Sequence, residues 1–360
     1  MDFSHTEAQQ ALSGLARRIL RERCDPRSWD EPGSGGFDRA LWTELARAGV
    51  VDAALPSTAG GGGFGLLEQC AVLVEIGRTV APVPYLATVT AAAAVAEFGD
   101  ARQVEREVVP VARGERVLTS ALADAGAPCG FTAQRTEDGW LVSGTQSTVP
   151  YAAFADAVLV PAVAADSTVL LIVGTGADGV TVEPQRTVDR GDAGLVRLTD
   201  VAVPDTAVLG SPDAAAWLRA RVTVAWCALQ LGVLDEALTR TAEYAKERKQ
   251  FDHAIAGFQA VRQRLADGHL DVEAVRLTLW QAASRLADGL PAERDVATAK
   301  FWAAEAGHRV AHTAVHIHGG VGIDTDHPLH RYFVAAKRAE FALGGATAQL
   351  RTLGGLLAPT

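Results

Sequence analysis

Apolar residues recur at helical spacing through the first 114 residues of the chain. Between Leu12 and Leu20 they return every three or four positions, which predicts an amphipathic helix with Ser4 as its N-cap and an end at Asp25-Pro26. The same spacing predicts further helices over Leu41–Val50, Leu66–Val80 and Leu86–Phe98. The glycine run Gly60–Gly63 lies between two of these helices, and we expect it to form a loop.

From about residue 117 to residue 210 the pattern changes to short, β-branched segments separated by Gly, Asp and Pro. Glu137-Asp138-Gly139 between two of them is typical of a hairpin turn. Strands at this spacing, with no helix between them, predict an antiparallel sandwich or barrel. The predicted strands are Thr132–Arg135, Trp140–Gly144, Ala157–Pro161, Val169–Val173, Val180–Pro184 and Leu195–Val203.

Helical spacing returns near Asp213 and continues to the end of the chain. Four long helices with short connections predict a helical bundle. The predicted helices are Ala214–Glu247, Phe258–Leu286, Ala292–His318 and His330–Leu357. We therefore expect an α+β multi-domain protein. Its parts would be an N-terminal helical domain over residues 1–114, a central antiparallel β-domain over 115–211 and a C-terminal four-helix bundle over 212–360.

Composition narrows the class of protein. Of the 360 residues 48% are hydrophobic and 21% are charged, and the net charge is −10, which is ordinary for a globular protein of two or three domains. No Lys/Arg cluster is dense enough to follow a nucleic acid. Four scattered cysteines argue against a disulfide framework. The first ten residues lack the features of a signal peptide, and no apolar run approaches the roughly 20 residues of a membrane helix. We expect a cytoplasmic protein without nucleic-acid or membrane partners.

The most specific pattern lies between Glu247 and Asp267. Arg248 and Phe251 are followed by Phe258-Gln259 and by Leu265-Ala266-Asp267. This segment resembles the flavin-contacting stretch R-x-x-F-G…F-Q…L-A-D of acyl-CoA dehydrogenases. Three further landmarks of that family occur in the expected order over nearly the whole chain. They are Leu55–Gly77, Asp200–Gly210 and Val315–Gly322, the last resembling Q-I-x-G-G-x-G with His316 in place of the usual glutamine.

The resemblance implies the acyl-CoA dehydrogenase fold and FAD as cofactor. Arg248 can clamp a pyrophosphate with a forked pair of hydrogen bonds, and we expect Phe251 to share its helix face and to offer a flat surface to a ring. Glycines let the backbone approach a phosphate closely. By resemblance, the residues that hold the FAD of a neighbouring subunit are Arg248, Phe251, Gln259, His316, Gly319 and Gly320. Taken singly, Arg248 could also be a solvated charge at a helix end and Phe251 a core residue. Gly319-Gly320 could be a helix C-cap.

The catalytic carboxylate of the family is missing. The usual glutamate, which removes the α-proton of the thioester, falls on Leu343, and the alternative position on an earlier helix falls on Val222. The flavin-ring contacts have also changed, because Ala123–Pro128 replaces T-E-P-x-x-G-S-D and Pro150 has no N–H to offer. We therefore assign no catalytic residue.

This selective loss resembles the non-catalytic subunit of the α2β2 acyl-CoA dehydrogenases of actinobacteria, which act on steroid side chains. The resemblance implies FAD-dependent α,β-dehydrogenation of an acyl-CoA thioester, in lipid or steroid catabolism, together with a homologous catalytic subunit. The alternatives are a homo-oligomer with a displaced base, for which Glu340 is the fallback candidate and Asp324 or Asp326 a further one, and a flavin-free scaffold. We assign no metal site, although His308, His312 and His316 share one predicted helix face.

Overall fold

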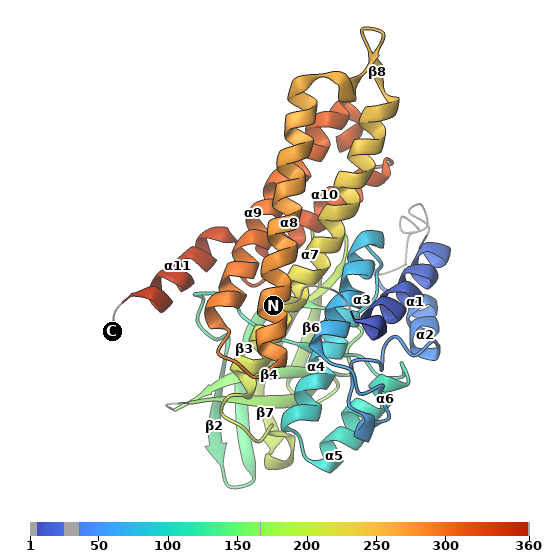
Figure 1. Cartoon of the computed structure of the whole chain (residues 1–360). Helices are drawn as coiled ribbons and strands as arrows, with labels where there is room; N and C mark the ends of the chain where they lie inside the picture. Colours follow the sequence, from blue (N-terminus) through green and yellow to red (C-terminus); the bar gives the residue numbers. More distant parts are fainter. Residues whose placement is uncertain (1–5, 25–35, 166, 359–360) are drawn as a thin grey trace. The chain divides into compact units, whose positions relative to one another are not determined.

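The computed structural model describes residues 6–24, 36–165 and 167–358 (Figure 1). The chain forms two compact units, each drawn from separate stretches of sequence. The first comprises Met1–Glu31, Cys70–Ala81 and Thr223–Thr360, and the second comprises Pro32–Gln69 and Pro82–Val222. The predicted domains, with boundaries near residues 114 and 211, are continuous stretches of sequence. Each of these units combines separate stretches, so the domain boundaries stay a prediction.

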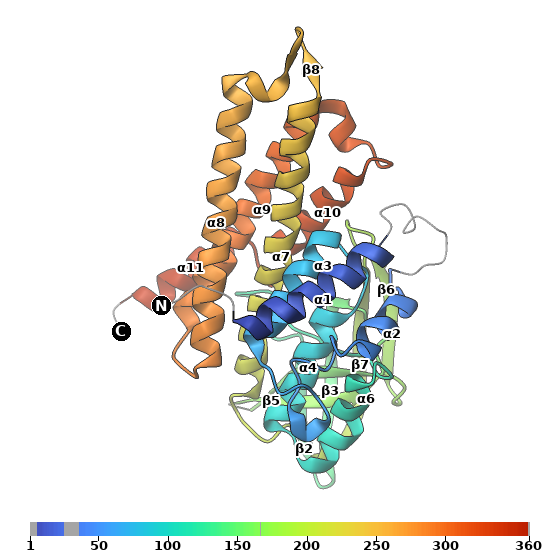
Figure 2. The ribbon, with the colours of Figure 1, turned by 45° about the vertical axis from the view of Figure 1, so that its right-hand side comes forward.

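The first unit is helical, and its long helices run side by side with a small β-hairpin at one end (Figures 1 and 2). Within it α9 packs against α8, α10 and α11. Two of the helices, α3 and α7, begin in the second unit. The elements are α1 (Glu7–Arg23), α3 (Leu66–Thr79), α7 (Ala214–Glu247), β8 (Lys249–Gln250), β9 (His253–Ala254), η5 (Ile255–Gly257), α8 (Gln259–Ala287), α9 (Glu293–His318), η6 (Gly319–Ile323), α10 (Pro328–Phe341) and α11 (Ala346–Leu357).

The long helices of the bundle confirm the helical periodicity, with one correction. Helix α7 has the predicted bounds, and α8 and α9 differ from theirs by one residue at either end at most. The helix predicted over His330–Leu357 is wrong as a single element, because the chain breaks between α10 and α11. Leu343 has a φ of 56° and Gly344 a φ of 94°, and a left-handed backbone cannot continue a right-handed helix.

Helix α1 begins with a capping box. The Thr6 hydroxyl accepts a hydrogen bond from the Gln9 N–H at 3.2 Å, and the Gln9 side chain accepts one from the Thr6 N–H at 3.1 Å. Two donors at the helix start are thereby satisfied. The predicted cap Ser4 and the predicted end at Asp25-Pro26 lie outside the described residues.

An ion pair fastens α1 to α3. The Arg17 guanidinium donates two hydrogen bonds of 2.8 Å to the carboxylate of Glu75, whose side chain is 4% exposed. Arg78 faces the same carboxylate at 3.5 Å. These side chains border a cavity of about 310 Å³ between α1, α3, α7 and α8. A buried carboxylate is stable only with such partners, so α1 and α3 depend on one another.

Helices α3 and α7 meet backbone to backbone in the first unit. A side chain added at Gly77 would place its Cβ 2.1 Å from the Leu229 carbonyl oxygen, and one at Gly232 would lie 2.0 Å from the Val74 oxygen. Glycine is therefore required on both helices at this crossing. Helix α7 is long and apolar enough to cross a membrane by length and composition, but 67% of the apolar window is buried, as in the core helix of a globular protein.

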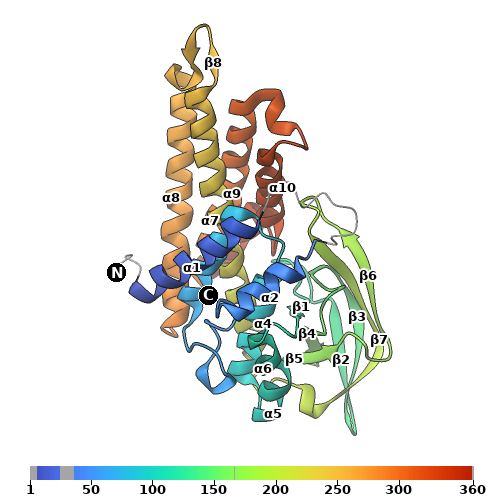
Figure 3. The ribbon, with the colours of Figure 1, turned by 90° about the vertical axis from the view of Figure 1, so that its right-hand side faces the viewer.

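The second unit contains the sheet and several short helices (Figure 3). Its elements are α2 (Arg39–Arg47), η2 (Ser57–Ala59), α4 (Tyr85–Phe98), α5 (Ala101–Gln103), η3 (Val104–Val108), α6 (Val109–Ala112), β1 (Leu118–Ser120), β2 (Phe131–Thr136), β3 (Gly139–Pro150), β4 (Ala157–Ala164), β5 (Ser167–Gly174), β6 (Val180–Arg186), β7 (Asp192–Pro204) and η4 (Asp205–Ala207). Helix α4 packs on β1, where the Thr88 hydroxyl donates to the Leu118 carbonyl at 2.9 Å.

All six predicted strands are present, and β1 is an additional one. The strand order is β1-β4-β2-β3-β7-β6, with β5 paired to β4. The sheet is mixed and not purely antiparallel, because β4 runs parallel to both β1 and β2. The β2–β3 hairpin separates β1 from β4 along the chain, so β4 can enter the sheet in the same direction as β1.

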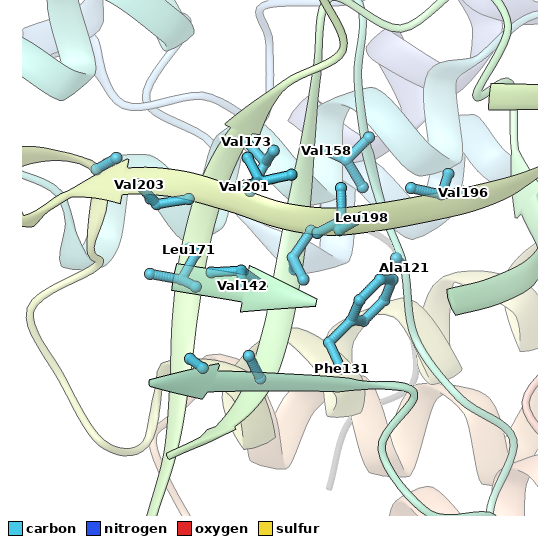
Figure 4. Packing of buried hydrophobic residues seen from close by; sticks show 14 of the residues in the cluster. Ala121, Phe131, Val142, Val158, Leu171, Val173, Val196, Leu198, Val201 and Val203 are labelled. Atoms are coloured by element: carbon cyan, nitrogen blue, oxygen red, sulfur yellow. The ribbon is translucent and has the colours of Figure 1, made fainter. Parts of the chain in front are cut away.

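Alternating residues of the strands form the core of this unit (Figure 4). In β2, Phe131 and Ala133 are buried whereas Thr132 and Gln134 are exposed, so the strand presents one face to the core. Fully burying a side chain of valine or leucine size contributes roughly 1.5–3 kcal/mol. The core residues labelled in Figure 4 are Ala121, Phe131, Val142, Val158, Leu171, Val173, Val196, Leu198, Val201 and Val203.

Candidate functional site

The β8–β9 hairpin, which follows one of the residues expected to bind a cofactor, lies at one end of the helical unit (Figures 1 and 3). Arg248 follows directly after α7, and the β8–β9 hairpin comes next. Phe251 and Asp252 form its turn with φ values of 54° and 62°, which is the backbone of a type I′ turn. The expectation that Phe251 shares a helix face with Arg248 is therefore wrong, because α7 ends at Glu247.

The hairpin exposes an aromatic side chain. Phe251 is 86% exposed, and its ring contacts the ring of Phe258 edge-on with centroids 6.4 Å apart. The hairpin is closed by a hydrogen bond of 2.8 Å from the Ile255 N–H to the Arg248 carbonyl. The turn of the hairpin therefore presents most of an aromatic side chain to water.

Helix α8 starts beside the hairpin at Gln259, which is exposed. Its N-cap residue, Phe258, supplies no side-chain hydrogen bond. The first N–H groups of a helix have no partner within the helix, and they form the positive end of its dipole. The start of α8 is therefore suited to an anionic group.

Helix α9 ends at the same end of the bundle. His316 is exposed on its last turn, and Gly319 is its C-cap with a φ of 65° and a ψ of −141°. No atom lies within 4 Å of a Cβ built on Gly319 or Gly320, so a ligand can approach the backbone there. The Gly319 N–H already donates to the Val315 carbonyl.

An aromatic stack joins these two chain segments. The ring of Tyr244 on α7 lies 4.2 Å from the ring of His318 on α9, with 19° between the planes. Tyr244 also accepts a hydrogen bond at its carbonyl from the N–H of Arg248 at 2.8 Å, and His318 precedes Gly319. The structure therefore places Arg248 and the glycine turn on either side of one contact.

The position of the family glutamate is buried and apolar. Leu343 is 8% exposed. Two buried side chains hold the turn around it. The Lys300 ammonium donates to the carbonyls of Ala339 and Glu340, and the Gln349 amide donates to the carbonyl of Leu343 at 3.1 Å. The turn is thus firmly built although its side chain cannot accept a proton.

The alternative position for the catalytic base, on α7, also has no carboxylate. Val222 and Thr223 are both 6% exposed, and neither carries a carboxylate. Their neighbour Arg221 lies with its guanidinium carbon 3.6 Å from the ring centroid of Trp217. Burial lowers the pKa of Arg221 to about 10. A cation, and not a base, therefore lies beside this position.

The carboxylate of Glu340, the fallback candidate for the catalytic base, is bound by other side chains. Its carboxylate accepts a hydrogen bond from the Lys337 ammonium at 2.8 Å and lies 3.4 Å from His308 Nδ1. A general base needs a free lone pair toward its substrate. Asp324 and Asp326 are exposed residues of one turn, in which the Asp326 N–H donates to Asp324.

Other side chains contact the histidine face of α9. The rings of His308 and His312 lie 4.5 Å apart, but the Lys337 ammonium is 2.9 Å from His308 Nδ1, where a cation would repel a metal ion. Burial and the nearby Lys337 lower the pKa of His312. Within residues 6–24, 36–165 and 167–358, no three His, Cys, Asp or Glu side chains are grouped to hold one metal ion.

The segments of the second unit that correspond to flavin-ring contacts are engaged within that unit. The Arg219 guanidinium donates to the Ala123 carbonyl at 2.7 Å, and burial lowers its pKa. The Pro150 carbonyl accepts a hydrogen bond from the Thr119 hydroxyl at 2.6 Å. Neither Ala123 nor Pro150 has a side-chain donor for a flavin ring.

Comparison with known proteins decides the family. The model of the acyl-CoA dehydrogenase N-terminal domain matches residues 6–115, and that of the acyl-CoA dehydrogenase C-terminal domain matches residues 216–355. The chain belongs to the acyl-CoA dehydrogenase family. The predicted fold class is thereby confirmed, and the protein belongs to a family of oxidoreductases, for which FAD is the general cofactor.

Individual acyl-CoA dehydrogenases match over the full length. The acyl-CoA dehydrogenase FadE27 of Mycobacterium tuberculosis is 48% identical and covers all of both chains. One chain in a crystal structure of the ChsE4-ChsE5 complex from the same species has 48% sequence identity to this protein. The match covers 100% of each of the two chains compared, with a TM-score of 0.96. A structure of the Tcur3481-Tcur3483 steroid ACAD G363A variant is 41% identical, covers 98% of each chain and has a TM-score of 0.92.

Some residues of the acyl-CoA dehydrogenase site were missed from the sequence. Lys300 carries a detectable signal, because it lies between the apolar positions Ala297, Ala303 and Ala304 of one helix face. Tyr244 lies four residues before Arg248, which places it one helical turn away. Only the folded chain shows that it meets His318.

Proposed function

We propose that this chain is the subunit without a catalytic base in a heteromeric acyl-CoA dehydrogenase, and that it helps to hold the FAD of a homologous catalytic subunit. One observation carries the proposal. Both positions for the glutamate, Leu343 and Val222, are buried and apolar, whereas the phosphate-binding features at the end of the bundle are present and exposed.

Each of these features has a separate role in holding FAD. Arg248 would hold the pyrophosphate with its charged guanidinium, and Gln259 with the start of α8 would add uncapped N–H groups. Phe251 would offer its ring to the cofactor. His316 and Gly320 would complete the hold on the phosphate, and the open space at Gly319 would let the group approach the backbone. The residues present fit this half of an FAD site.

The division of the reaction follows from the residue types. Bound FAD supplies the acceptor for the β-hydride of the thioester. The α-proton needs a carboxylate within hydrogen-bond reach. This chain offers a leucine and a valine at the two family positions, so the base comes from the partner subunit.

The similar structures support a partner and a substrate class. The ChsE4-ChsE5 structure is a complex by its title, and the Tcur3481-Tcur3483 structure is called a steroid ACAD. By analogy, this chain pairs with a second acyl-CoA dehydrogenase homologue and acts on the CoA thioester of a steroid side chain or another lipid. We place the protein in the cytoplasm, where its scattered free cysteines stay reduced.

Co-expression with a homologous acyl-CoA dehydrogenase subunit tests the proposal. The purified complex should contain about one FAD per two chains, as expected for two unlike subunits that share each site. The chain purified alone should bind little FAD and should not oxidise acyl-CoA. Robust dehydrogenation by the isolated homomer would refute the proposal. A colourless complex without FAD would favour the flavin-free scaffold.

A further inference from the structure

Two side chains outside the expected cofactor-binding set connect the segments that carry that set. Tyr244 lies on the last turns of α7, four residues before Arg248, and His318 is the last residue of α9, directly before the glycine turn. Their rings are stacked with centroids 4.2 Å apart. The contact bridges two helices that are far apart in sequence.

One hydrogen bond fixes the orientation of the His318 ring. The residue is 6% exposed, and its Nδ1 lies 2.9 Å from the Ala314 carbonyl oxygen. Because a carbonyl only accepts, Nδ1 carries a proton. Nε2 therefore stays unprotonated in the neutral ring.

A second histidine packs against the first. The ring centroid of His327 lies 5.6 Å from that of His318. Nδ1 of His327 accepts a hydrogen bond from the Leu329 N–H at 3.3 Å and so caps α10. This bond needs a lone pair on Nδ1. In the described chain, the titratable groups facing His318 are Tyr244 from α7 and His327 from the start of α10.

We propose that Tyr244 and His318 are positioning residues, which hold Arg248 and the Gly319-Gly320 turn in the arrangement that binds the FAD of the partner subunit. This inference rests on the proposed function. Losing the stack would let the ends of α7 and α9 move apart, so that Arg248 and the glycine turn would no longer face one pyrophosphate.

The arrangement depends on an uncharged His318. Burial lowers the pKa of His318, the bond to Ala314 raises it to a smaller extent, and His327 lowers it further. A histidine with a lowered pKa favours the folded arrangement in its neutral form. The stabilisation is therefore complete above the ordinary pKa of about 6.5 and is lost as the pH falls below it. FAD should leave the complex faster in mildly acidic solution.

The test measures the rate of FAD release from the co-expressed complex by flavin fluorescence, between about pH 5 and pH 8. Tyr244→Leu removes the stack and should release FAD roughly three- to tenfold faster at pH 7.5, in line with the strength of an aromatic pair. Tyr244→Phe keeps the ring and should restore the wild-type rate. His318→Phe keeps a ring but cannot be protonated, so its rate of FAD release should rise much less than that of wild type as the pH falls. His269→Asn, at an exposed position of α8, is the matched control, and its rate of FAD release should rise as much as that of wild type.

Three outcomes separate the two proposals. Wild-type FAD release from Tyr244→Leu, or full acid acceleration in His318→Phe, would overturn the positioning roles. If Arg248→Ala also releases FAD at the wild-type rate, the proposed function itself fails. If Tyr244→Leu does not assemble with its partner, the comparison of His318→Phe with wild type across the pH range still decides the question.

Discussion

Single residues carry the proposed division of the reaction between subunits. Leu343 occupies a turn held by Lys300 and Gln349, and its side chain has no ionisable group. Arg248 differs from Leu343, because its side chain is exposed and has a charge and shape suited to a pyrophosphate.

Removal of the Arg248 guanidinium should weaken FAD binding. Arg248→Ala in the complex is expected to lower FAD affinity by about 10- to 100-fold, since it deletes a bidentate charged contact. The measurement is a titration of the apo-complex with FAD. Arg351→Ala, at an exposed arginine of α11, is the control and should leave the affinity unchanged. Equal affinities for both variants would contradict the assignment.

Glu340 provides the test of a displaced base. Because its carboxylate is bound by Lys337 and lies beside His308, we expect Glu340→Gln to leave the turnover of the complex within about twofold of wild type. The measurement is the rate of acyl-CoA oxidation with an artificial electron acceptor. Loss of turnover with FAD still bound would instead identify Glu340 as the base.

Some helices and strands could be predicted from the sequence, and others could not. The bounds of α7 were predicted correctly, because a long helix shows its period over many turns. The β8–β9 hairpin was missed, since its turn residues Phe251 and Asp252 lack the glycine or asparagine that usually marks a type I′ turn. The break at Leu343 was missed for a similar reason, because leucine rarely adopts a positive φ.

The sheet and the site show a second limit of sequence patterns. Alternation located six strands, but it contains no information on which strands pair. The parallel contacts of β4 with β1 and β2 therefore had to come from the structure. The expected cofactor residues rest on the family resemblance, whereas the Tyr244–His318 contact joins distant segments and has no local signal.

The crossing of α3 and α7 should tolerate no side chain at Gly77. Gly77→Ala would push a Cβ to 2.1 Å from the Leu229 carbonyl oxygen, and we expect a loss of about 1–3 kcal/mol in the free energy of unfolding. Gly14→Ala is the matched control, because no atom lies within 4 Å of its Cβ. In the interior of a helix it should stabilise the protein by about 0.5–1 kcal/mol. Urea unfolding monitored by circular dichroism measures both changes.

At the scale of the whole molecule, the chain belongs to the acyl-CoA dehydrogenase family over its full length. Its match to FadE27 covers all of both chains at 48% identity. The exposed Phe251 ring and the uncapped start of α8 are suited to a cofactor shared between chains.

Thermal stability should reveal where FAD binds. A ligand stabilises only the form that binds it. Added FAD is therefore expected to raise the melting temperature of the assembled complex by several degrees, roughly in proportion to the logarithm of its concentration. The same addition should not change the melting temperature of the chain alone. A clear shift for the isolated chain would show that it holds a complete FAD site by itself.

The ion pair between Arg17 and Glu75 has a practical consequence for shortened forms of the protein. A version that begins after α1 would keep the buried Glu75 carboxylate but remove the two hydrogen bonds that Arg17 donates to it. Arg78 would still face the carboxylate, and Arg17 is itself half-exposed, so the loss is smaller than for a fully buried pair. An N-terminal truncation that spares every expected cofactor-binding residue would therefore still be less stable than the full chain.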